Sequence, residues 1–249
     1  MTTLKVLSYN IKVGGVGREE LIASVINADT PDIVLLQEAT RPTSVRRIAE
    51  LANMPTVICA PGRSVACITR LAVKSHRYVR PLFSQHAFLE VVLNDINARL
   101  FGVHLSAVHA AWTERRRVRE LRSLLAAIRD AADTFHMIAG DLNTLAPNEA
   151  LDVTRLPYRL RVLVWLSGGR IRWQTIAIML GANYIDAFRT LEPTDAGYTF
   201  PTWAPHVRLD YAFLPKPNSD RLISCSVVRE SPEVKRASDH FPLRIEVRV

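Results

Sequence analysis

Residues 135–143 read FHMIAGDLN, an apolar run that stops at Asp141 within the turn Gly140-Asp141-Leu142-Asn143. Apolar runs of this length are typical of β-strands. Taken alone, the turn is equally consistent with an Asx turn, in which Asp141 serves only the local backbone. The segment becomes decisive because other strands along the chain end in a similar way.

Five further apolar runs have, at or near one end, a polar side chain that could take part in catalysis or metal binding. They are LKVLSYN at 4–10, DIVLLQE at 32–38, LFGVH at 100–104, RLDYAFL at 208–214 and FPLRIEVRV at 241–249, the last preceded by Ser238-Asp239-His240. DIVLLQE is almost continuously apolar, which indicates a strand buried on both faces. Each end has a structural explanation of its own, such as a turn at Asn10 or a helix N-terminus at Glu38. Only the whole set favours a shared site.

Helical patterns lie between these strands. Apolar residues recur with helical spacing over 19–28, 45–52 and, most strongly, 113–132, where Val118, Leu121, Leu124, Leu125 and Ile128 form a stripe with arginines on the other face. A helix is also expected over 173–180, and short strands between 57 and 105. Both halves alternate strands with helices, without a linker or repeat. We therefore expect one α/β (α+β) domain over residues 1–249, with two sheets packed face to face and helices outside.

The composition is that of a globular protein with an excess of positive charge. Of the 249 residues, 48% are hydrophobic, and Lys plus Arg (32) exceed Asp plus Glu (24), giving a formal net charge of +8. This field attracts polyanions such as nucleic acid or an anionic membrane surface. Three cysteines without metal-ligand spacing argue against a disulfide framework or a cysteine zinc site.

Export and membrane insertion are not expected. The first residues, MTTLK, lack an apolar signal core. The most apolar stretch, 160–180, is interrupted by arginines and glycines, so it does not span a membrane. We expect a cytoplasmic protein, a monomer without integral membrane association.

Three features are candidates for substrate binding, and each has a structural alternative. Arg115 and Arg116 begin an arginine run that forms either a solvated helix face or a set of phosphate contacts. Phe200 and Trp203 are either stacking groups for a base or sugar, or loop anchors. The basic and apolar segment 155–172 is either an amphipathic helix over a sheet edge or a substrate- or surface-binding element.

Six segments in fixed order carry a family resemblance: SYN at 8, QE at 37, HLS at 104, GDLN at 140, RLDY at 208 and SDH at 238. Together they resemble the endonuclease/exonuclease/phosphatase superfamily, the metal-dependent phosphodiesterases that include DNase I-like nucleases and abasic-site endonucleases. Any one segment is weak evidence, whereas six in order span nearly the whole chain. The resemblance implies a four-layer α/β sandwich with two mixed sheets, in agreement with the strand and helix patterns.

The resemblance also implies a metal site and a residue that holds or deprotonates the attacking water. Glu38 is expected to be the principal Mg²⁺ ligand, with Asn10 and Asp239 close to the metal and Mn²⁺ as a substitute, because hard cations prefer oxygen ligands. Asp141 is expected to hold or deprotonate the attacking water, and Asn143 to orient the phosphate or the water.

Histidines complete the implied machinery. His240 is expected to contact the scissile phosphate, with Asp210 fixing its ring and keeping it protonated. His104 matches a histidine on the leaving-group side, where abasic-site endonucleases often carry tyrosine. Its structural alternative is a core histidine at a strand end. The division of acid and base roles between Asp141 and His240 stays open.

Several differences from the pattern of abasic-site endonucleases favour a general nuclease over an enzyme dedicated to abasic sites. Val207 stands where those enzymes usually carry tryptophan, Lys12 where they carry an acidic or amide residue, and Ala39-Thr40 where they carry Thr-Lys. The leading hypothesis is a Mg²⁺-dependent phosphodiester hydrolase, a nuclease acting on DNA by metal-assisted attack of water. The alternatives are a phosphoesterase for a lipid or small-molecule phosphate, with 160–180 at a membrane surface, and a catalytically silent binding module. The presence of all the expected catalytic residues argues against the silent module.

Overall fold

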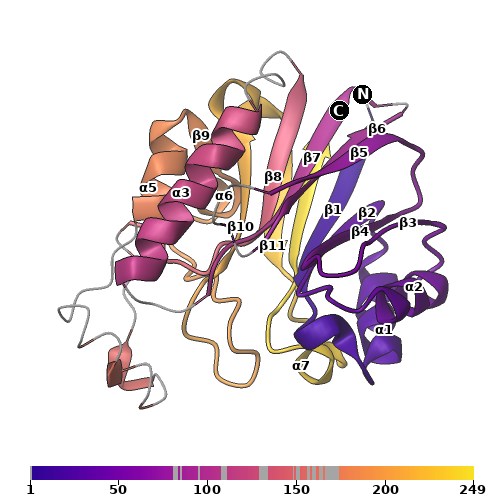
Figure 1. Ribbon diagram of the computed structural model, residues 1–249, viewed down its shortest axis with the longest axis horizontal. Coiled ribbons are helices and arrows are strands. Elements are labelled where there is room, and N and C mark those ends of the chain that lie inside the picture. The colour runs from indigo at the N-terminus through magenta and orange to yellow at the C-terminus, as the bar shows by residue number, and fades with distance from the viewer. Residues whose placement is uncertain are drawn as a thin grey trace.

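Two six-stranded mixed β-sheets pack face to face, with helices on both outer sides (Figure 1). The computed structural model describes residues 2–80, 84, 86–94, 96–107, 111–128, 134–147, 149, 152–155, 158, 161–162, 165 and 174–249. The expected α/β sandwich is confirmed. Of the helices in the described part of the chain, none combines the length and apolarity that a membrane-crossing segment needs.

The first sheet takes its strands from both ends of the chain, and the second takes its strands from the middle. The first has the order β11-β12-β1-β2-β4-β3, built from β1 (Thr3–Asn10), β2 (Ile33–Gln37), β3 (Thr56–Ile58), β4 (Val65–Thr69), β11 (Leu222–Val227) and β12 (Leu243–Arg248). The second has the order β5-β6-β7-β8-β10-β9, built from β5 (Val73–Val79), β6 (Phe88–Leu93), β7 (Ala98–His104), β8 (Phe135–Asp141), β9 (Tyr184–Asp186) and β10 (Asp210–Pro215). The inner faces of both sheets form the main hydrophobic core.

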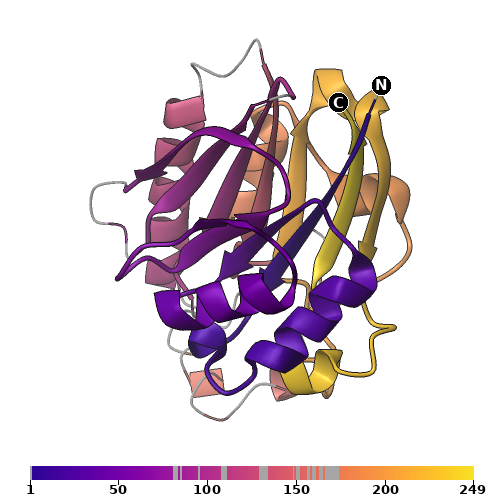
Figure 2. The same ribbon diagram turned by 90° about the vertical axis from the view of Figure 1, so that its right-hand side faces the viewer.

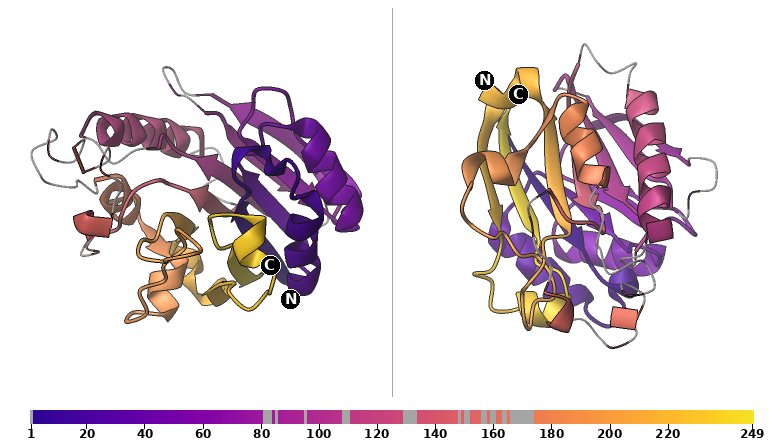
Figure 3. Two further views of the ribbon diagram at one scale, coloured as in Figure 1. Left: turned by 90° about the horizontal axis from the view of Figure 1, so that it is seen from below. Right: turned by 90° about the vertical axis from the view of Figure 1, so that its left-hand side faces the viewer.

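Helices cover the outer faces. They are α1 (Glu19–Asp29), α2 (Pro42–Leu51), α3 (Ala111–Ile128), α5 (Gln174–Gly181), α6 (Ala187–Leu191) and α7 (Val234–Ala237), with 3₁₀ turns at Val13–Gly15, Val153–Arg155 and Lys216–Arg221. In Figure 2, α1 and α2 stand in front of the first sheet. The view from below shows these two helices and α3 at opposite sides of the sheets (Figure 3, left).

The predicted helices are present, with small shifts at their ends. The helix predicted over 45–52 begins at Pro42, because proline's fixed φ suits the first helical turn. The apolar stripe of α3 is buried as expected, with Leu121 and Leu124 each 1% exposed. Residues 129–132, Trp173 and most of the segment 155–172 lie outside the described residues, so the alternatives for that segment remain predictions.

The topology brings the predicted strand ends to one edge of the sandwich, here called the rim. Each sheet is parallel only at its centre, where β1 pairs with β2 and β7 pairs with β8. The carboxyl ends of these four strands lie at the rim. β10 and β12 run antiparallel to β8 and β1, so their starting residues lie there as well. Both chain termini are at the opposite end, where Thr3 pairs with Arg248 (Figure 1).

Candidate active site

The strand register of the second sheet places three of the predicted site residues next to one another on adjacent strands. His104 is paired with Asp141 across β7 and β8, and Asp141 is paired with Asp210 across β8 and β10. All three side chains are buried. Asn10 lies at the end of β1 in the first sheet, and its Nδ2 donates to Asp141 Oδ2 at 2.9 Å. The two sheets therefore meet at the carboxylate of Asp141.

Gly140 makes the close approach of β7 and β8 sterically feasible. Its φ is +155°, and a Cβ added there would lie only 1.9 Å from the carbonyl oxygen of Val103. Directly after it, Asp141 Oδ1 accepts from the backbone N–H of Asn143 at 2.9 Å. The predicted Asx turn therefore exists, and the same carboxylate also faces the rim through its other oxygen.

Asn143 is held in a fixed orientation. Its backbone is left-handed, with φ of 51°, and its side-chain Nδ2 donates to the carbonyl oxygen of Leu105 at 3.1 Å. Asparagine tolerates this conformation better than most residues. The bond ties the turn after β8 to the loop that follows His104.

Glu38 is enclosed by the loop that follows β1. Its backbone is left-handed, with φ of 56°, which turns the chain sharply after β2. Glu38 Oε2 accepts from the backbone N–H of Val13 at 2.6 Å, and Oε1 lies 3.3 Å from Asn10 Nδ2, which donates to it. Val13 itself has φ of 47°, an unfavourable value for a β-branched residue. Strain of this kind concentrates at functional sites.

Asp210 and His240 form a buried pair. His240 Nδ1 and Asp210 Oδ2 are 2.9 Å apart, and His240 Nε2 lies 3.9 Å from Asp141 Oδ2. Burial alone would lower the pKa of His240, but the carboxylates of Asp210, Asp141 and Asp239 together raise it to about 9. Burial also raises the pKa of Asp141 above its ordinary value. The predicted pairing of Asp210 with His240 is therefore present in the structure.

His104 occupies the other side of Asp141, with Nε2 3.9 Å from Asp141 Oδ2. Burial, helped by the neighbouring histidines, lowers its pKa to about 3, so the ring is neutral. Its Nδ1 is buried and has no hydrogen-bond partner among the described residues. The residue is thus a buried histidine, and it also faces the shared site.

Sequence reasoning missed His86. Its ring stacks on that of His104, with centroids 4.5 Å apart and planes 8° from parallel. Burial lowers the pKa of His86, and Glu120, Arg116 and Glu38 are among the charges that act on it. His86 lies in the loop between β5 and β6 rather than at a strand end, so no pattern in the sequence marks it.

The donors at the rim suit a divalent cation. The side-chain oxygens of Asn10, Glu38 and Asp239 are of the type that Mg²⁺ and Mn²⁺ prefer. Asn10 Oδ1 accepts from the backbone N–H of Lys12 at 3.0 Å, and its Nδ2 faces Glu38 and Asp141. The ammonium of Lys12 lies 3.2 Å from Asp239 Oδ2, so the position already accommodates positive charge. Asp210 Oδ1 is buried without a hydrogen-bond partner among the described residues.

A second group of donors lies beside the first. Asp141, Asp210 and His240 have potential ligand atoms within 4.8 Å of one another. This group includes an imidazole nitrogen, and the Nδ1 of His240 is already hydrogen-bonded to Asp210 Oδ2 at 2.9 Å, whereas Mg²⁺ prefers oxygen ligands. The oxygen-only set therefore fits Mg²⁺ better.

The arginine run on α3 divides between surface and interior. Arg115 is exposed, and Arg116 is half-buried with its Nε 3.6 Å from Glu120 Oε1. Arg117 is only 1% exposed, and its guanidinium pairs with Glu114 at 2.9 Å and donates to the Ser106 carbonyl. The expectation that the arginines share one solvated face is therefore wrong for Arg117, which anchors the loop that follows His104.

Phe200 lies beside His240 and Trp203 lies beside Phe200, with ring centroids 6.3 Å apart, but the two residues differ in exposure. The Phe200 ring is half-buried, with its centroid 4.8 Å from that of His240. Trp203 is 66% exposed, and its ring lies 5.7 Å from Lys12 Nζ. Phe200 therefore packs against the His240 ring, whereas Trp203 is mostly in solvent beside the Lys12 ammonium.

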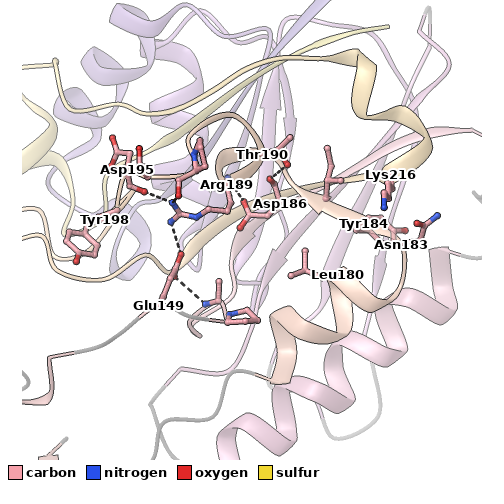
Figure 4. A pocket seen from close by; sticks show the side chains of 16 residues that line it. Glu149, Leu180, Asn183, Tyr184, Asp186, Arg189, Thr190, Asp195, Tyr198 and Lys216 are labelled. Atoms are coloured by element: carbon pink, nitrogen blue, oxygen red, sulfur yellow. Dashed lines mark hydrogen bonds and ion pairs between the residues drawn. The ribbon is translucent and has the colours of Figure 1, made fainter.

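A cavity of about 770 Å³ lies on the side of α6 and β9, and none of the predicted site residues lines it (Figure 4). Arg189 and Glu149 form an ion pair of 3.0 Å in its wall. Glu149 and Asp186 also bind the buried Arg208, two residues before Asp210. This network fixes the start of β10 and hence the position of Asp210.

Comparison with solved structures identifies the same fold in several nucleases. An AP endonuclease from Archaeoglobus fulgidus is 17% identical with a TM-score of 0.73, and the match covers 99% of this chain and 100% of that one. An endonuclease/exonuclease/phosphatase from Beutenbergia cavernae is 20% identical with a TM-score of 0.74, covering 100% of this chain and 72% of that one. A 3′-5′ exonuclease from Neisseria meningitidis is 16% identical with a TM-score of 0.72, covering 99% and 100%.

At these identities the solved structures establish the fold alone. No curated protein matches the sequence. The model of the endonuclease/exonuclease/phosphatase family, in contrast, matches residues 7–240, nearly the whole chain and all six sequence segments. This protein therefore belongs to the endonuclease/exonuclease/phosphatase family, whose members are metal-dependent hydrolases of phosphoric ester bonds.

Proposed function

We propose that the protein is a Mg²⁺-dependent phosphodiesterase that cleaves DNA. The observation that carries the proposal is the position of Asp141, which accepts from Asn10 of the opposite sheet and lies 3.9 Å from the nearest ring nitrogen of both His104 and His240. This arrangement surrounds a buried carboxylate with a hydrogen-bond donor and two histidines at the rim. It is the geometry expected for attack of water on a phosphate held between the two sheets.

Each residue has a separate proposed role. Asn10, Glu38 and Asp239 would hold the ion, which polarises a phosphate oxygen when bound. Asp141 accepts the proton of the attacking water, and Asn143, fixed by Leu105, orients the phosphate. His240, kept protonated by Asp210, places positive charge against the phosphate oxygens. His104 lies on the leaving-group side, with His86 stacked behind it.

DNA is the proposed substrate because of charge and position. The formal net charge of +8 favours a polyanion. Arg115 and Arg116 lie in the first turns of α3, which follows the loop after His104, so they are on the rim side of the molecule. Contacts with backbone phosphates carry no sequence information, so cleavage is expected to show little sequence preference.

The test is digestion of plasmid, of a single-stranded oligonucleotide, and of a duplex with or without one abasic site. We expect cleavage of undamaged DNA with Mg²⁺ and at most a modest preference for the abasic duplex, since Val207 replaces the usual tryptophan. A preference of several orders of magnitude, lost in Trp203→Ala, would contradict the generalist assignment. Tyr158 and Trp165 are strongly exposed, which suits the lipid alternative. Hydrolysis of phospholipid vesicles without DNA cleavage would favour it.

Salt dependence tests the two surface arginines. The logarithm of the DNA-binding constant falls linearly with the logarithm of the salt concentration, and each phosphate contact contributes roughly 0.9 to the magnitude of that slope. The double variant Arg115→Ala/Arg116→Ala is therefore expected to reduce the magnitude of the slope by about 2. Arg117 stays unchanged, since its burial makes it unsuitable as a charge probe. The measurement is fluorescence-anisotropy binding to a labelled duplex between low and moderate salt.

The matched control removes two arginines from the opposite end of the sheets, Arg221→Ala/Arg248→Ala. Arg248 pairs with Thr3 at that end, and Arg221 follows the end of β10. The control is expected to keep the slope of the unmodified protein. An equal change in both double variants would mean that only total charge matters, and Arg115 and Arg116 would then be ordinary surface residues.

A further inference from the structure

A second, smaller cavity of about 210 Å³ adjoins the candidate metal site. It is formed by the loop after β1, by α7 with the segment that follows it, and by Trp203, and it is lined by Lys12, Val13, Arg18, Trp203, Lys235, Arg236, Ser238 and Asp239. Four of these side chains are cationic and one is acidic. Pockets that enclose a whole drug-sized ligand are larger, about 300–1,000 Å³. The cavity, here called the basic pocket, therefore has the size of a subsite.

The cations of the basic pocket differ in what they already bind. Arg18 donates to the carbonyl oxygens of Ile11, Lys12 and Ala237, so it builds the pocket by joining the loop to α7. Lys235 is exposed, and Arg236 is 71% exposed while it pairs with Glu233. Lys12 is half in solvent, pairs with Asp239 Oδ2 at 3.2 Å and lies 5.7 Å from the Trp203 ring centroid, so a phosphate on Lys12 would share its ammonium with that carboxylate. The ends of Lys235 and Arg236 remain in solvent beside the cavity and are available to a phosphate.

Trp203 supplies the apolar wall of the basic pocket. It is 66% exposed and Val13, another lining residue, is 68% exposed, although both are apolar. The loop beneath Trp203 is fixed, since Thr202 donates through its backbone N–H to the Asp239 carbonyl and through its hydroxyl to the Ser238 carbonyl, each at 2.9 Å. An exposed aromatic ring on a fixed loop is suited to stacking with a nucleobase.

We propose that the basic pocket binds the nucleoside monophosphate unit next to the scissile phosphate, with its base on Trp203 and its phosphate on Lys12 and Lys235. The proposal rests on the proposed function, because Asp239 belongs to both the pocket and the metal site. It adds a substrate requirement: a good substrate carries a second phosphate beside the one that is cleaved. A simple diester leaves the pocket empty.

The first experiment measures binding without catalysis. Calorimetric titration with thymidine 5′-monophosphate in EDTA is expected to show saturable binding, and thymidine without the phosphate is expected to bind at least about tenfold more weakly. The nucleotide should also quench tryptophan fluorescence, and this quenching should disappear in Trp203→Leu. Equal affinity for thymidine, or quenching that survives in Trp203→Leu, would overturn the proposal.

Variants of Lys235 test where the phosphate of the bound nucleotide lies. Lys235→Ala is expected to weaken binding of the nucleotide about tenfold, and Lys235→Arg to retain it. Lys74→Ala is the matched control, because Lys74 is an exposed lysine at the start of β5, at the opposite end of the sheets from the rim. Affinity that is unchanged in Lys235→Ala, or that falls equally in Lys74→Ala, would contradict a specific phosphate contact.

Cleavage separates this inference from the proposed function. The dinucleotides TpT, pTpT and TpTp share one scissile bond, and kcat/KM for one of the two phosphorylated forms is expected to exceed that for TpT about tenfold. Lys235→Ala should remove most of that advantage, while Lys74→Ala keeps it. If none of the three is cleaved with Mg²⁺, the proposed function fails, and the binding measurements still decide the pocket. If all three are cleaved equally, only the pocket proposal fails.

Discussion

Replacing His240 by alanine is expected to lower kcat on DNA about 10²- to 10⁴-fold, the usual range for one preorganised catalytic group. The physical reason is the buried pair with Asp210, which holds the imidazole 3.9 Å from Asp141 Oδ2 and raises its pKa to about 9. Removal of the ring takes away the positive charge that faces the phosphate. The measurement is steady-state cleavage of a fluorogenic oligonucleotide.

A double-mutant cycle tests whether the pair acts as a unit. Asp210→Asn alone is expected to cost a factor comparable to that of His240→Ala, and the double variant little more than either single variant. Strictly multiplicative losses would show that the two residues act independently. His76→Ala, at an exposed histidine on β5, is the control for general effects of removing an imidazole. Circular dichroism of each variant confirms that the fold persists.

Chelation with EDTA is expected to abolish activity, and addition of Mg²⁺ or Mn²⁺ to restore it. The side-chain oxygens of Asn10, Glu38 and Asp239 are of the type that binds a hard cation, and His240 alone is not expected to replace the polarisation that the ion supplies. Full activity in EDTA would remove the proposed mechanism, whatever the substrate. The measurement is cleavage of the same oligonucleotide during titration of each metal.

Glu38→Gln tests the principal ligand. The amide retains the shape of the side chain but loses its charge, so the Mg²⁺ concentration at half-maximal activity is expected to rise at least about tenfold. Calorimetric titration with Mn²⁺ gives a readout that does not depend on catalysis. Glu50→Gln, at an exposed carboxylate on α2, is the matched control and should titrate like the unmodified protein. An unchanged metal titration in Glu38→Gln would exclude Glu38 as the ligand.

The sequence predicted most of the elements from local patterns, but not β9, β11, α6 or α7. Strand period and helix period depend on neighbours along the chain, so β8 ends at Asp141 as expected and the stripe of α3 is buried. Six polar residues at strand ends also indicated one site, since parallel strands with intervening helices bring their carboxyl ends to a common edge. The family motifs then assigned roles to those residues before any distance was known.

Arg117 shows a signal that was present in the sequence. It lies four residues before Leu121 and seven before Leu124, on the buried stripe rather than opposite to it. The charge of Arg117 suggested a position in solvent, whereas its helical spacing from Leu121 and Leu124 indicates the buried face of α3. Its partner Glu114, three residues earlier, makes this burial tolerable, because a buried charge needs a paired and hydrogen-bonded partner.

The sequence by itself determined most of the strands and helices, the order of the motifs and the polar residues that meet at the rim. Only the tertiary structure decided that His86 stacks on His104 and that Lys12, Trp203 and Lys235 enclose one pocket. These residues lie in separate loops or on α7, and contacts between distant loops depend on how the two sheets pack rather than on any local period. Local sequence preferences act over a few residues, whereas Lys12 and Lys235 are brought together by the pairing of β1 with β12 and by the bonds of Arg18 to both loops.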